Sequence, residues 1–533
     1  MMGVINISAM RLIKKQIFLS LGLLLSFSYL DAMCPQTVGP ISINDGMWSL
    51  LSRVGVAQNV IQSQICALDF DCDMCPDFDC STTATCSCLS DVSDCISFGQ
   101  SDIGAGGVYT ISSPGVYCMS NDATFTNGAA ITVNSSDVTI DMQNHTLNAG
   151  SNSGTTGIVI NGGLSNITIK NGSITNPTVA CISNDSSTSL LQNIIIQNMN
   201  FSVIGGTTSY PGILIQQNSL TAQFNSILIE NCTGYNTYIS LKGGSSCVVR
   251  GCGFVSALAN GNANIAIFGP AGFNTQLAVI EDCTLVNDSA SYPAGVASFF
   301  LEFALTAIIR NCVSSGSASP AFTFSAVARP TVSDCVAQQC VSDGFYFVPG
   351  AAGATPPVTV SVVNCLAQKC HNGFFIASVM GNVGYDSVVL TNSVAHNNSS
   401  CGFKINNAGI GNIPLVCMNC TANGNAADGF EIGGGAGSAG PIGYGVLTAC
   451  SSSENSSNGY LISAQAVVLV LEHCTAVSNA GYGFFDQSPG SPSTYFYIGC
   501  RSLANGTPYT ADVPAQFSYE PGPVDYGMNL YSL

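Results

Sequence analysis

The stretch Ile227-Leu228-Ile229-Glu230-Asn231-Cys232 decides the fold, because shorter variants of it recur along the chain. Each variant is a run of β-forming residues that ends in Asn, Asp or Gly followed by Cys. The column of terminal residues continues at intervals of 20 to 31 residues as Cys252, Cys283, Cys312, Cys335, Cys365, Ser393, Cys420, Cys450, Cys474 and Cys500. A recurrence at this period indicates a repeat architecture.

Two further columns keep the same phase. A glycine followed by an aromatic residue comes about nine residues after the later cysteines, at Gly344-Phe345, Gly373-Phe374, Gly402-Phe403, Gly429-Phe430, Gly459-Tyr460 and Gly483-Phe484. Five residues after the cysteine column stand Cys340, Cys370, Asn398, Asn425, Asn455, Asn479 and Asn505. Three columns in one phase indicate that each interval is one structural unit.

Each unit holds two or three short runs of β-formers separated by Asn, Gly and Ser, which is the pattern of one coil of a parallel β-solenoid. The consensus of leucine-rich repeats and the periodicity of helical repeats are both absent. Roughly 400 residues at about 27 per coil predict about fifteen coils. Equivalent residues then stack along the axis. We expect the stacked cysteines to be mostly free buried thiols, with Cys340 and Cys370 as the best candidate for a bridge.

Two stretches resemble a known group of proteins. Residues 137–147, Asp-Val-Thr-Ile-Asp-Met-Gln-Asn-His-Thr-Leu, follow Pro114-Gly-Val-Tyr117 and resemble its first-coil motif, and residues 166–174 resemble its generic coil. The group is the secreted right-handed parallel β-helix proteins of the pectin-lyase-like superfamily, and the likeness covers about residues 102–505. It implies an all-β fold, a single-stranded right-handed parallel β-helix. Its members include lyases, hydrolases, adhesins and tailspikes, so the likeness does not choose an activity.

Composition excludes several classes. Twelve Lys and Arg stand against thirty Asp and Glu, for a net charge of −18, so nucleic acid is not an expected partner. An apolar fraction of 46% excludes disorder driven by charge. No apolar run long enough to span a bilayer follows the N-terminus.

The N-terminus carries export signals. A basic start at residues 10–15 precedes a short apolar stretch at 17–25, and this pattern predicts a signal peptide over residues 1–32. A membrane anchor is the alternative, but the apolar stretch is too short to span. We therefore expect a secreted or cell-surface protein with no membrane span after signal removal.

Residues 33–101 are expected to form a helical, Cys-rich segment before the β-helix. A heptad pattern predicts a helix over 46–68, which either caps the β-helix or forms a trimer; we favour the cap. Seven cysteines between Cys66 and Cys95 favour a disulfide-stapled linker over a zinc site, a redox pair or a calcium site. Residues 506–533 are expected to be a C-terminal cap or tail.

The best candidate site lies two residues before the cysteine column. Its outward positions carry Lys170, Glu230, Arg250, Glu281 and Arg310, and we expect Glu302 to approach from a preceding strand. Alternating acids and bases on adjacent coils could bind or cleave an acidic sugar. Stacked surface ion pairs are the favoured interpretation, because such pairs are common.

Other ionisable residues fit structural roles. Asp141 and His145 could be read as an acid and a base, but His145 is expected to pack in a turn. Turn positions are also occupied by Asp282, Asp334, Asp343 and Asp428. The Gly-His-Gly and Arg-x-Lys elements that the resemblance would require of a galacturonase are absent. We predict no cofactor, with calcium as the one alternative.

The sequence therefore supports two hypotheses about function. The favoured one is a binding or structural module that contacts carbohydrate or a surface partner, without a recognisable catalytic site. The alternative is a polysaccharide lyase or glycoside hydrolase that uses the outer face of the β-helix.

Overall fold

A computed structural model places most of the repeat region. It describes residues 95–104, 108–150, 153–185, 191–204, 209–216, 226–256, 264–269, 275–287, 297–349, 358–378, 385–407, 414–433, 442–462, 466–486, 494–509 and 530–531. The chain divides into two units, Met1–Cys88 and Leu89–Leu533, and all described residues lie in the second. The predicted signal peptide, the predicted helix over 46–68 and its trimer contact lie outside the described residues.

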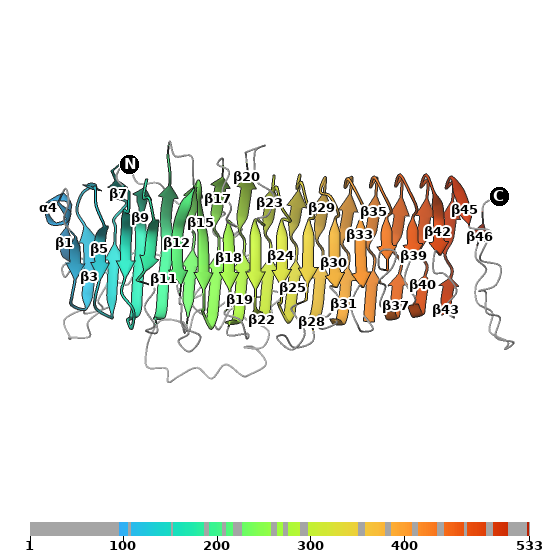
Figure 1. Cartoon of the computed structure of the whole chain (residues 1–533), viewed down its shortest axis with the longest axis horizontal. Helices are drawn as coiled ribbons and strands as arrows, with labels where there is room; N and C mark the ends of the chain where they lie inside the picture. Colours follow the sequence, from blue (N-terminus) through green and yellow to red (C-terminus); the bar gives the residue numbers. More distant parts are fainter. Residues whose placement is uncertain are drawn as a thin grey trace, which may run out of the picture. The chain divides into compact units, whose positions relative to one another are not determined.

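The second unit is a solenoid of two parallel sheets, whose strands line up coil after coil (Figure 1). Sheet B takes one strand from each coil. Over the described residues it contains 16 strands: β2 (Tyr109–Ile111), β5 (Ala129–Val133), β8 (Thr156–Ile160), β10 (Ala180–Asn184), β12 (Tyr210–Gln216), β15 (Thr237–Lys242), β18 (Ile265–Phe268), β21 (Phe299–Glu302), β24 (Phe322–Ser325), β27 (Phe345–Val348), β30 (Phe374–Ser378), β33 (Phe403–Asn407), β36 (Phe430–Ile432), β39 (Tyr460–Ile462), β42 (Tyr482–Asp486) and β45 (Thr507–Tyr509).

Sheet A takes two strands from most coils, one before and one after the Asn-Cys turn. The pre-turn strands are β1 (Ile96–Phe98), β3 (Gly115–Met119), β6 (Val138–Asp141), β13 (Ile227–Glu230), β16 (Ser246–Arg250), β19 (Thr275–Glu281), β22 (Ala304–Arg310), β25 (Arg329–Ser333), β28 (Val358–Val363), β31 (Tyr385–Thr391), β34 (Pro414–Met418), β37 (Ile442–Thr448), β40 (Ala466–Glu472) and β43 (Thr494–Ile498). The post-turn strands are β4 (Ala123–Phe125), β7 (Thr146–Ala149), β14 (Thr233–Tyr235), β17 (Gly253–Ser256), β20 (Thr284–Asn287), β23 (Val313–Ser315), β26 (Val336–Gln338), β29 (Leu366–Gln368), β32 (Val394–His396), β35 (Thr421–Asn423), β38 (Ser451–Ser453), β41 (Thr475–Val477), β44 (Arg501–Leu503) and β46 (Leu530–Tyr531). β9 (Ser165–Thr175) and β11 (Gln192–Ser202) run through the turn and belong to both sets.

The predicted fold class, an all-β parallel β-solenoid, is confirmed. In the part of the chain that is described, the helical content is one short helix, α4 (Gln100–Ile103). Within that part, no helix has the length and apolar character needed to cross a bilayer.

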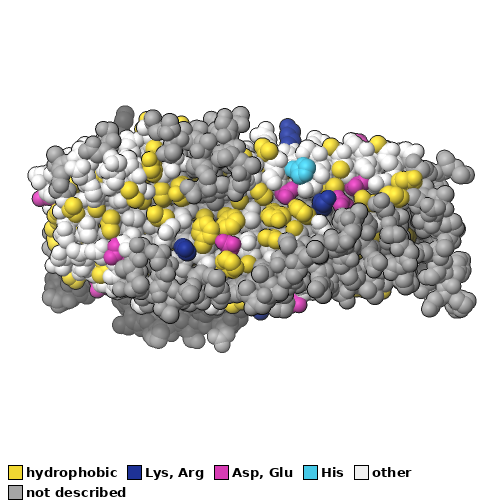
Figure 2. Space-filling model, viewed as in Figure 1, with side chains coloured by type: hydrophobic (Ala, Val, Ile, Leu, Met, Phe, Trp, Pro, Cys, Tyr) yellow, Lys and Arg dark blue, Asp and Glu magenta, His cyan; other side chains and the backbone are white. Residues whose placement is uncertain are grey.

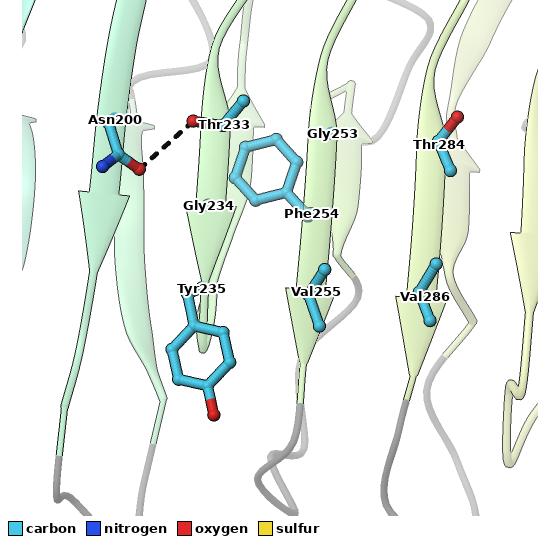
Figure 3. Close-up of a pocket in the computed structure, with 9 residues that line it drawn as sticks. All are labelled: Asn200, Thr233, Gly234, Tyr235, Gly253, Phe254, Val255, Thr284 and Val286. Atoms are coloured by element: carbon cyan, nitrogen blue, oxygen red, sulfur yellow. Dashed lines mark hydrogen bonds between the residues drawn. The ribbon is translucent and has the colours of Figure 1, made fainter.

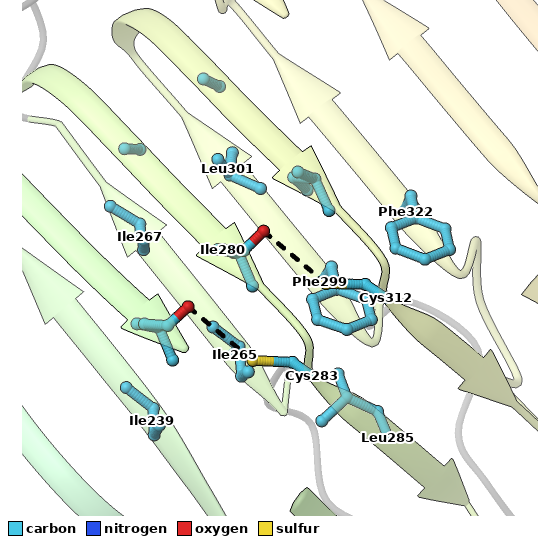
Figure 4. Close-up of a cluster of buried hydrophobic side chains, with 14 of the residues drawn as sticks. Ile239, Ile265, Ile267, Ile280, Cys283, Leu285, Phe299, Leu301, Cys312 and Phe322 are labelled. Carbon is cyan, nitrogen blue, oxygen red and sulfur yellow. Dashed lines mark hydrogen bonds between the residues drawn. The ribbon is translucent and has the colours of Figure 1, made fainter. Parts of the chain in front are cut away.

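The first of the inward columns of sheet B changes character midway, from isoleucine to aromatic side chains. Its members are Ile131, Ile158, Ile182, Ile213, Ile239, Ile265, Phe299, Phe322, Phe345, Phe374, Phe403, Phe430, Tyr460 and Phe484. The aromatic rings stack nearly parallel, with centroids 4.7 to 4.9 Å apart. Figure 4 shows the junction, where Ile239 and Ile265 are followed by Phe299 and Phe322. The predicted aromatic stack is confirmed.

The glycine before each stacked aromatic is required by close packing between coils. A Cβ on Gly344, Gly373 or Gly402 would lie 2.5 to 2.7 Å from the carbonyl oxygen of the next glycine in the column. A real Cβ does not approach an oxygen that closely, so only glycine fits. This contact explains the Gly-aromatic column of the sequence.

The asparagine column forms a buried hydrogen-bonded ladder. Asn425 Nδ2 donates to Asn455 Oδ1 at 2.8 Å, and Asn455 Nδ2 donates to Asn479 Oδ1 at 2.8 Å. The same oxygens also accept backbone N–H groups, as in the 2.9 Å bond from Asn425 N to Asn455 Oδ1. Buried polar groups need hydrogen-bonding partners. Within the ladder, the oxygen of each asparagine side chain accepts from the asparagine one coil before it, and the amide group donates to the asparagine one coil after it.

The cysteine column is buried and reduced. All sixteen cysteines that are free in the described residues are buried, including Cys340 and Cys370, which form no bridge. Cys283 Sγ donates to the carbonyl oxygens of Glu281, at 3.1 Å, and Val249, at 3.8 Å. Cys312 Sγ likewise donates to the carbonyl oxygen of Ile280 at 3.7 Å (Figure 4). The expectation of mostly free buried thiols is therefore confirmed for these residues.

The turn before the cysteine column uses left-handed backbone angles. Asn231, Asp282 and Asn311 have φ values of 52°, 53° and 52°. Asn311 Nδ2 donates to Asp282 Oδ1 at 3.1 Å, from one coil to the one before it. Asn and Asp tolerate this conformation better than other residues with a side chain, which explains their place in the motif.

One disulfide stands at the N-terminal end of the described coils. Cys95, the last cysteine of the Cys-rich segment, is bonded to Cys118 of β3. Next to it, β1 pairs in parallel with β3. The bond thus ties the chain entering the β-helix to its first complete coil.

Candidate functional site

The predicted charged row is formed on the outside of the pre-turn strands. Glu230, Arg250, Glu281 and Arg310 occupy one register position on four successive coils. Arg310 Nη2 donates to Glu281 Oε2 at 2.7 Å. Arg250 Nε lies 2.7 Å from Glu230 Oε1, close enough for an ion pair but not aligned as a hydrogen bond. Each acid is thus neutralised by one base, and exposed pairs of this kind contribute about 0–1 kcal/mol.

Two other predicted residues lie apart from this group. Lys170 is in the same row but two coils before Glu230, with its Nζ 3.4 Å from Asp141 Oδ2. Glu302 is not part of the row, because it ends β21 in sheet B, in register with Ser325. Burial raises the pKa of Glu302, although a 3.4 Å hydrogen bond from Ser325 Oγ opposes the shift. A catalytic role stays a prediction for each of the candidate residues, Glu230, Arg250, Glu281, Glu302 and Arg310.

His145 occupies a turn. Its Nδ1 lies 3.3 Å from Asp122 Oδ1, which also accepts the backbone N–H of Thr146 at 2.9 Å. The backbone hydrogen bond, with the His145 ring, lowers the pKa of Asp122. These contacts fit the predicted role of His145 in turn packing.

A second group, which sequence reasoning missed, lies on the outer face of sheet B. Tyr346, Phe375, Lys404 and Glu431 share one outward row on successive coils. The rings of Tyr346 and Phe375 are 5.4 Å apart and tilted by 40°. Lys404 Nζ donates to Glu431 Oε2 at 2.7 Å. Charged side chains are sparse on the face shown in Figure 2, and several of both signs gather beside a histidine.

A column of turn residues borders this row. Asp343, Asn372, Cys401 and Asp428 each precede the glycine of the Gly-aromatic motif. Asn372 Nδ2 donates to Asp343 Oδ1 at 2.8 Å, and Cys401 N donates to Asn372 Oδ1 at 3.2 Å. Cys401 Sγ donates to Glu431 Oε2 at 3.1 Å. The Glu431 carboxylate therefore accepts hydrogen bonds from both the Cys401 thiol and the Lys404 ammonium group.

Burial perturbs the ionisation of this group. Burial raises the pKa of Asp343, and burial followed by the nearby Asp343 charge raises the pKa of Tyr346. Burial alone would lower the pKa of Lys404, but the Glu431 carboxylate outweighs it, so that the pKa is raised. Burial and Glu431 together raise the pKa of Cys401 to about 12. Perturbed groups gathered on one face mark a candidate functional site.

The chemistry open to this group follows from those states. At neutral pH Lys404 is a cation and Cys401 is a protonated thiol, so neither supplies a free base or a thiolate nucleophile. The ligand atoms of Cys401, Asp428 and Glu431 lie within 4.8 Å of one another, a donor set that could hold a metal ion. A metal would have to displace the Lys404 ammonium from Glu431, and we assign none. The Cys-rich segment to which the calcium alternative belonged lies almost entirely outside the described residues.

A shallow trough opens on the post-turn strands of sheet A (Figure 3). Its volume is about 380 Å³ and its lining carries no acidic or basic side chain. The lining consists of Asn200, Thr233, Gly234, Tyr235, Gly253, Phe254, Val255, Thr284 and Val286. These residues come from β11, β14, β17 and β20, which are neighbours in the sheet.

Comparisons with known proteins agree with the topology. The model of the family described as a right handed beta helix region matches residues 211–383. The structure is similar to a double mutant of the periplasmic alginate epimerase AlgG, with 12% identity, 76% of this chain and 77% of that chain covered, and a TM-score of 0.26. It is similar to the A-module of the Azotobacter vinelandii mannuronan C-5 epimerase AlgE4, with 9% identity, 75% and 90% covered, and a TM-score of 0.29.

A further similarity is to PfbA, a surface adhesin of Streptococcus pneumoniae, with 11% identity, 78% of this chain and 86% of that chain covered, and a TM-score of 0.23. No curated protein matches the sequence. The two parallel sheets make the described part of the chain a parallel β-helix repeat structure, and its central coils match the family model of right-handed β-helices.

Proposed function

We propose that this protein is exported and binds carbohydrate along the outer face of sheet B, without catalysing a reaction there. The observation that carries the proposal is the outward row in which Tyr346 and Phe375 precede the Lys404–Glu431 pair in register. The row presents one side chain per coil, so a polymer lying along the axis would meet aromatic and charged groups in turn.

The chemistry of the row suits sugars. The apolar faces of sugar rings pack against aromatic side chains, and their hydroxyl groups need hydrogen-bonding partners. Tyr346 and Phe375 offer partly exposed rings, and the Lys404–Glu431 pair offers both donors and acceptors. The buried turn residues Asp343 and Asn372 border the same row and are bonded to each other.

Binding is favoured over turnover by the state of the ionisable groups. Lys404 is held as a cation by Glu431, and the Cys401 thiol is protonated at neutral pH. A lyase needs a base that can take a proton from the sugar, and a paired ammonium has no lone pair for this.

Export is supported by two features. The basic and apolar N-terminal pattern is typical of a signal peptide. The Cys95–Cys118 disulfide suits an oxidising compartment. Cell fractionation with N-terminal sequencing of the mature protein tests this part, and a cytosolic protein with an intact N-terminus would contradict it.

The binding proposal is tested with the full chain on a glycan array, followed by calorimetric titration of the best ligand. Phe375→Ala is expected to weaken binding at least about tenfold, since an aromatic side chain that the ligand covers carries much of the binding energy of an interface. Tyr444→Ala is the matched control, because Tyr444 is an exposed aromatic residue on sheet A. Unchanged binding by Phe375→Ala, or no binding to any glycan, would contradict the proposal.

A second candidate is a polysaccharide lyase or glycoside hydrolase on the same face. It is favoured by Glu302 and Asp343, two acids whose pKa values are raised by burial and which could therefore act as proton donors. Incubation with acidic and neutral polysaccharides, with and without calcium, tests it. Release of unsaturated or reducing ends that is lost in Asp343→Asn would support catalysis over simple binding.

A further inference from the structure

The trough on sheet A exists because one side chain is missing from a row. Thr233, Gly253 and Thr284 occupy one outward register position on successive coils, and Val313 follows them. A Cβ placed on Gly253 meets no atom within 4 Å, so the space above this residue is open. The threonines on either side then form two walls of a hollow that is one coil wide (Figure 3).

The next outward row supplies apolar walls. Tyr235 is 44% exposed and Val255 is 38% exposed, and Val286 continues the row. On the far side Thr233 Oγ1 donates to Asn200 Oδ1 at 3.1 Å, so the rim carries an oriented amide and a hydroxyl group. The trough thus combines an aromatic ring, aliphatic surface and uncharged polar groups.

We propose that this trough is a subsite for one sugar ring of a neutral glycan. Its volume of about 380 Å³ is at the lower end of the range found for small-ligand sites. The Tyr235 ring and Val255 can cover the apolar face of a sugar, while Thr233, Thr284 and Asn200 can bond to its hydroxyl groups.

The absence of charge in the lining selects against acidic sugars. A carboxylate entering the trough would lose water without gaining a cation, and the whole chain already carries a net charge of −18. The nearest predicted bases, Arg250 and Arg310, lie on pre-turn strands and are paired with Glu230 and Glu281. The inference rests on the proposed carbohydrate-binding function but assigns a separate site with its own selectivity.

Gly253→Thr tests the subsite directly. It would continue the row of Thr233 and Thr284, it fills the hollow, and the extended backbone at this residue accepts a β-branched side chain. The melting temperature is therefore expected to stay the same or rise. Val336→Thr is the matched control, because it changes the same row outside the trough.

The ligands are hexasaccharides of neutral β-1,4-linked glucose and mannose, and an oligogalacturonate of the same length, titrated into the full chain by calorimetry. Gly253→Thr is expected to weaken binding of a neutral hexasaccharide at least about tenfold, with Val336→Thr close to wild type. The oligogalacturonate is expected to show no change with Gly253→Thr.

The possible failures are distinguishable. If Gly253→Thr, folded by its melting temperature, binds neutral hexasaccharides as wild type does while Phe375→Ala loses binding, the trough is not a site and the proposed function stands. If the oligogalacturonate depends on Gly253, the assigned neutral selectivity is wrong. If no oligosaccharide binds to any variant, both proposals fall.

Discussion

The two halves of sheet B fill the same inward position with different side chains. From β5 to β18 the inner column is isoleucine, and from β21 to β42 it is phenylalanine with one tyrosine, at an unchanged register position. Only the second half adds the asparagine ladder from Asn398 to Asn505 and the glycine column that starts at Gly344. The backbone repeat therefore does not require aromatic stacking, and the second half gains interactions that the first half lacks.

Buried polar atoms without a hydrogen bond do not distinguish the halves. Among the described residues, Ser209 Oγ, Thr237 Oγ1 and Asn264 Oδ1 lie in the isoleucine half, and Ser314 Oγ, Thr323 Oγ1, Asn406 Oδ1 and Asn423 Oδ1 lie in the phenylalanine half. The difference in stability must therefore come from the ring stacks and the asparagine ladder. Because the first half lacks both, it is where we expect local opening to begin.

The largest expected effect compares the two columns directly. Phe403→Ala is expected to lower the free energy of unfolding by about 4–5 kcal/mol and Ile239→Ala by about 2–3 kcal/mol, because Phe403 also loses two ring stacks of about 0.5–1.5 kcal/mol each. Urea unfolding followed by far-ultraviolet circular dichroism measures both. An equal or greater loss of unfolding free energy for Ile239→Ala would contradict the proposed difference between the two columns.

The asparagine ladder gives the next largest effect. Asn455→Ala removes the oxygen that accepts both the backbone N–H and the side-chain amide of Asn425. The buried N–H is then unpaired, and the amide keeps only its 3.4 Å hydrogen bond to the carbonyl oxygen of Ala395. The expected loss is about 2–4 kcal/mol in the same unfolding experiment. Ser453→Ala, in the neighbouring strand, is the control and should change stability by less than about 0.5 kcal/mol. Similar losses for the two variants would show that the ladder is not a stabilising feature.

The buried Asp343 predicts a pH dependence of known sign. Burial raises its pKa in the folded state above the unfolded value, so folding favours the protonated form. The stability that this preference contributes is complete below the unfolded pKa and is lost as the pH rises through the folded pKa. Asp343→Asn keeps an acceptor for Asn372 and removes the buried charge.

Asp343→Asn is therefore expected to be more stable than wild type at neutral pH, with the difference vanishing in acid. Thermal melts of both proteins between acidic and neutral pH measure the gap. A gap that widens on acidification would contradict the assigned cause.

The smallest expected effect concerns the charged row, which runs across the junction of the two halves. Arg310→Ala removes an exposed ion pair with Glu281 and should cost less than about 1 kcal/mol, and nothing measurable in 1 M salt. Unfolding at low and high salt tests this. A loss of several kcal/mol would mean that surface charge, and not the core column, distinguishes the halves.

Much of the fold could be predicted from the sequence. Each column holds mostly one residue type, so it shows which residues of successive coils lie in register. The cysteine, Gly-aromatic and asparagine columns keep a fixed phase, so the stacking of Phe345, Phe374 and Phe403 follows from the sequence. The Lys404–Glu431 pair carried a similar signal, since each residue directly follows a stacked aromatic, in successive coils. The pair could therefore have been predicted from the sequence.

Other features depend on geometry that the columns do not report. Glu302 was expected to approach the charged row from a preceding strand, but it ends β21 in sheet B. A turn through Phe303, with φ of 53°, then moves the chain to sheet A within one residue. The residue after each cysteine gives the row that contains Gly253, yet only coordinates show that the space above it is open. Isolated breaks in the repeat are therefore harder to predict than the repeat itself.

Hydrogen exchange of the full chain, followed by mass spectrometry of its peptides, tests the central claim most directly. We predict slower exchange in the second half: the amides of β30, β33 and β36 should exchange at least about tenfold more slowly than those of β12, β15 and β18. The first three strands lie next to the stacked phenylalanines and the asparagine ladder. Equal protection of the two sets, or slower exchange in the isoleucine half, would contradict the claim that stacked aromatic and amide columns make the second half the more stable one.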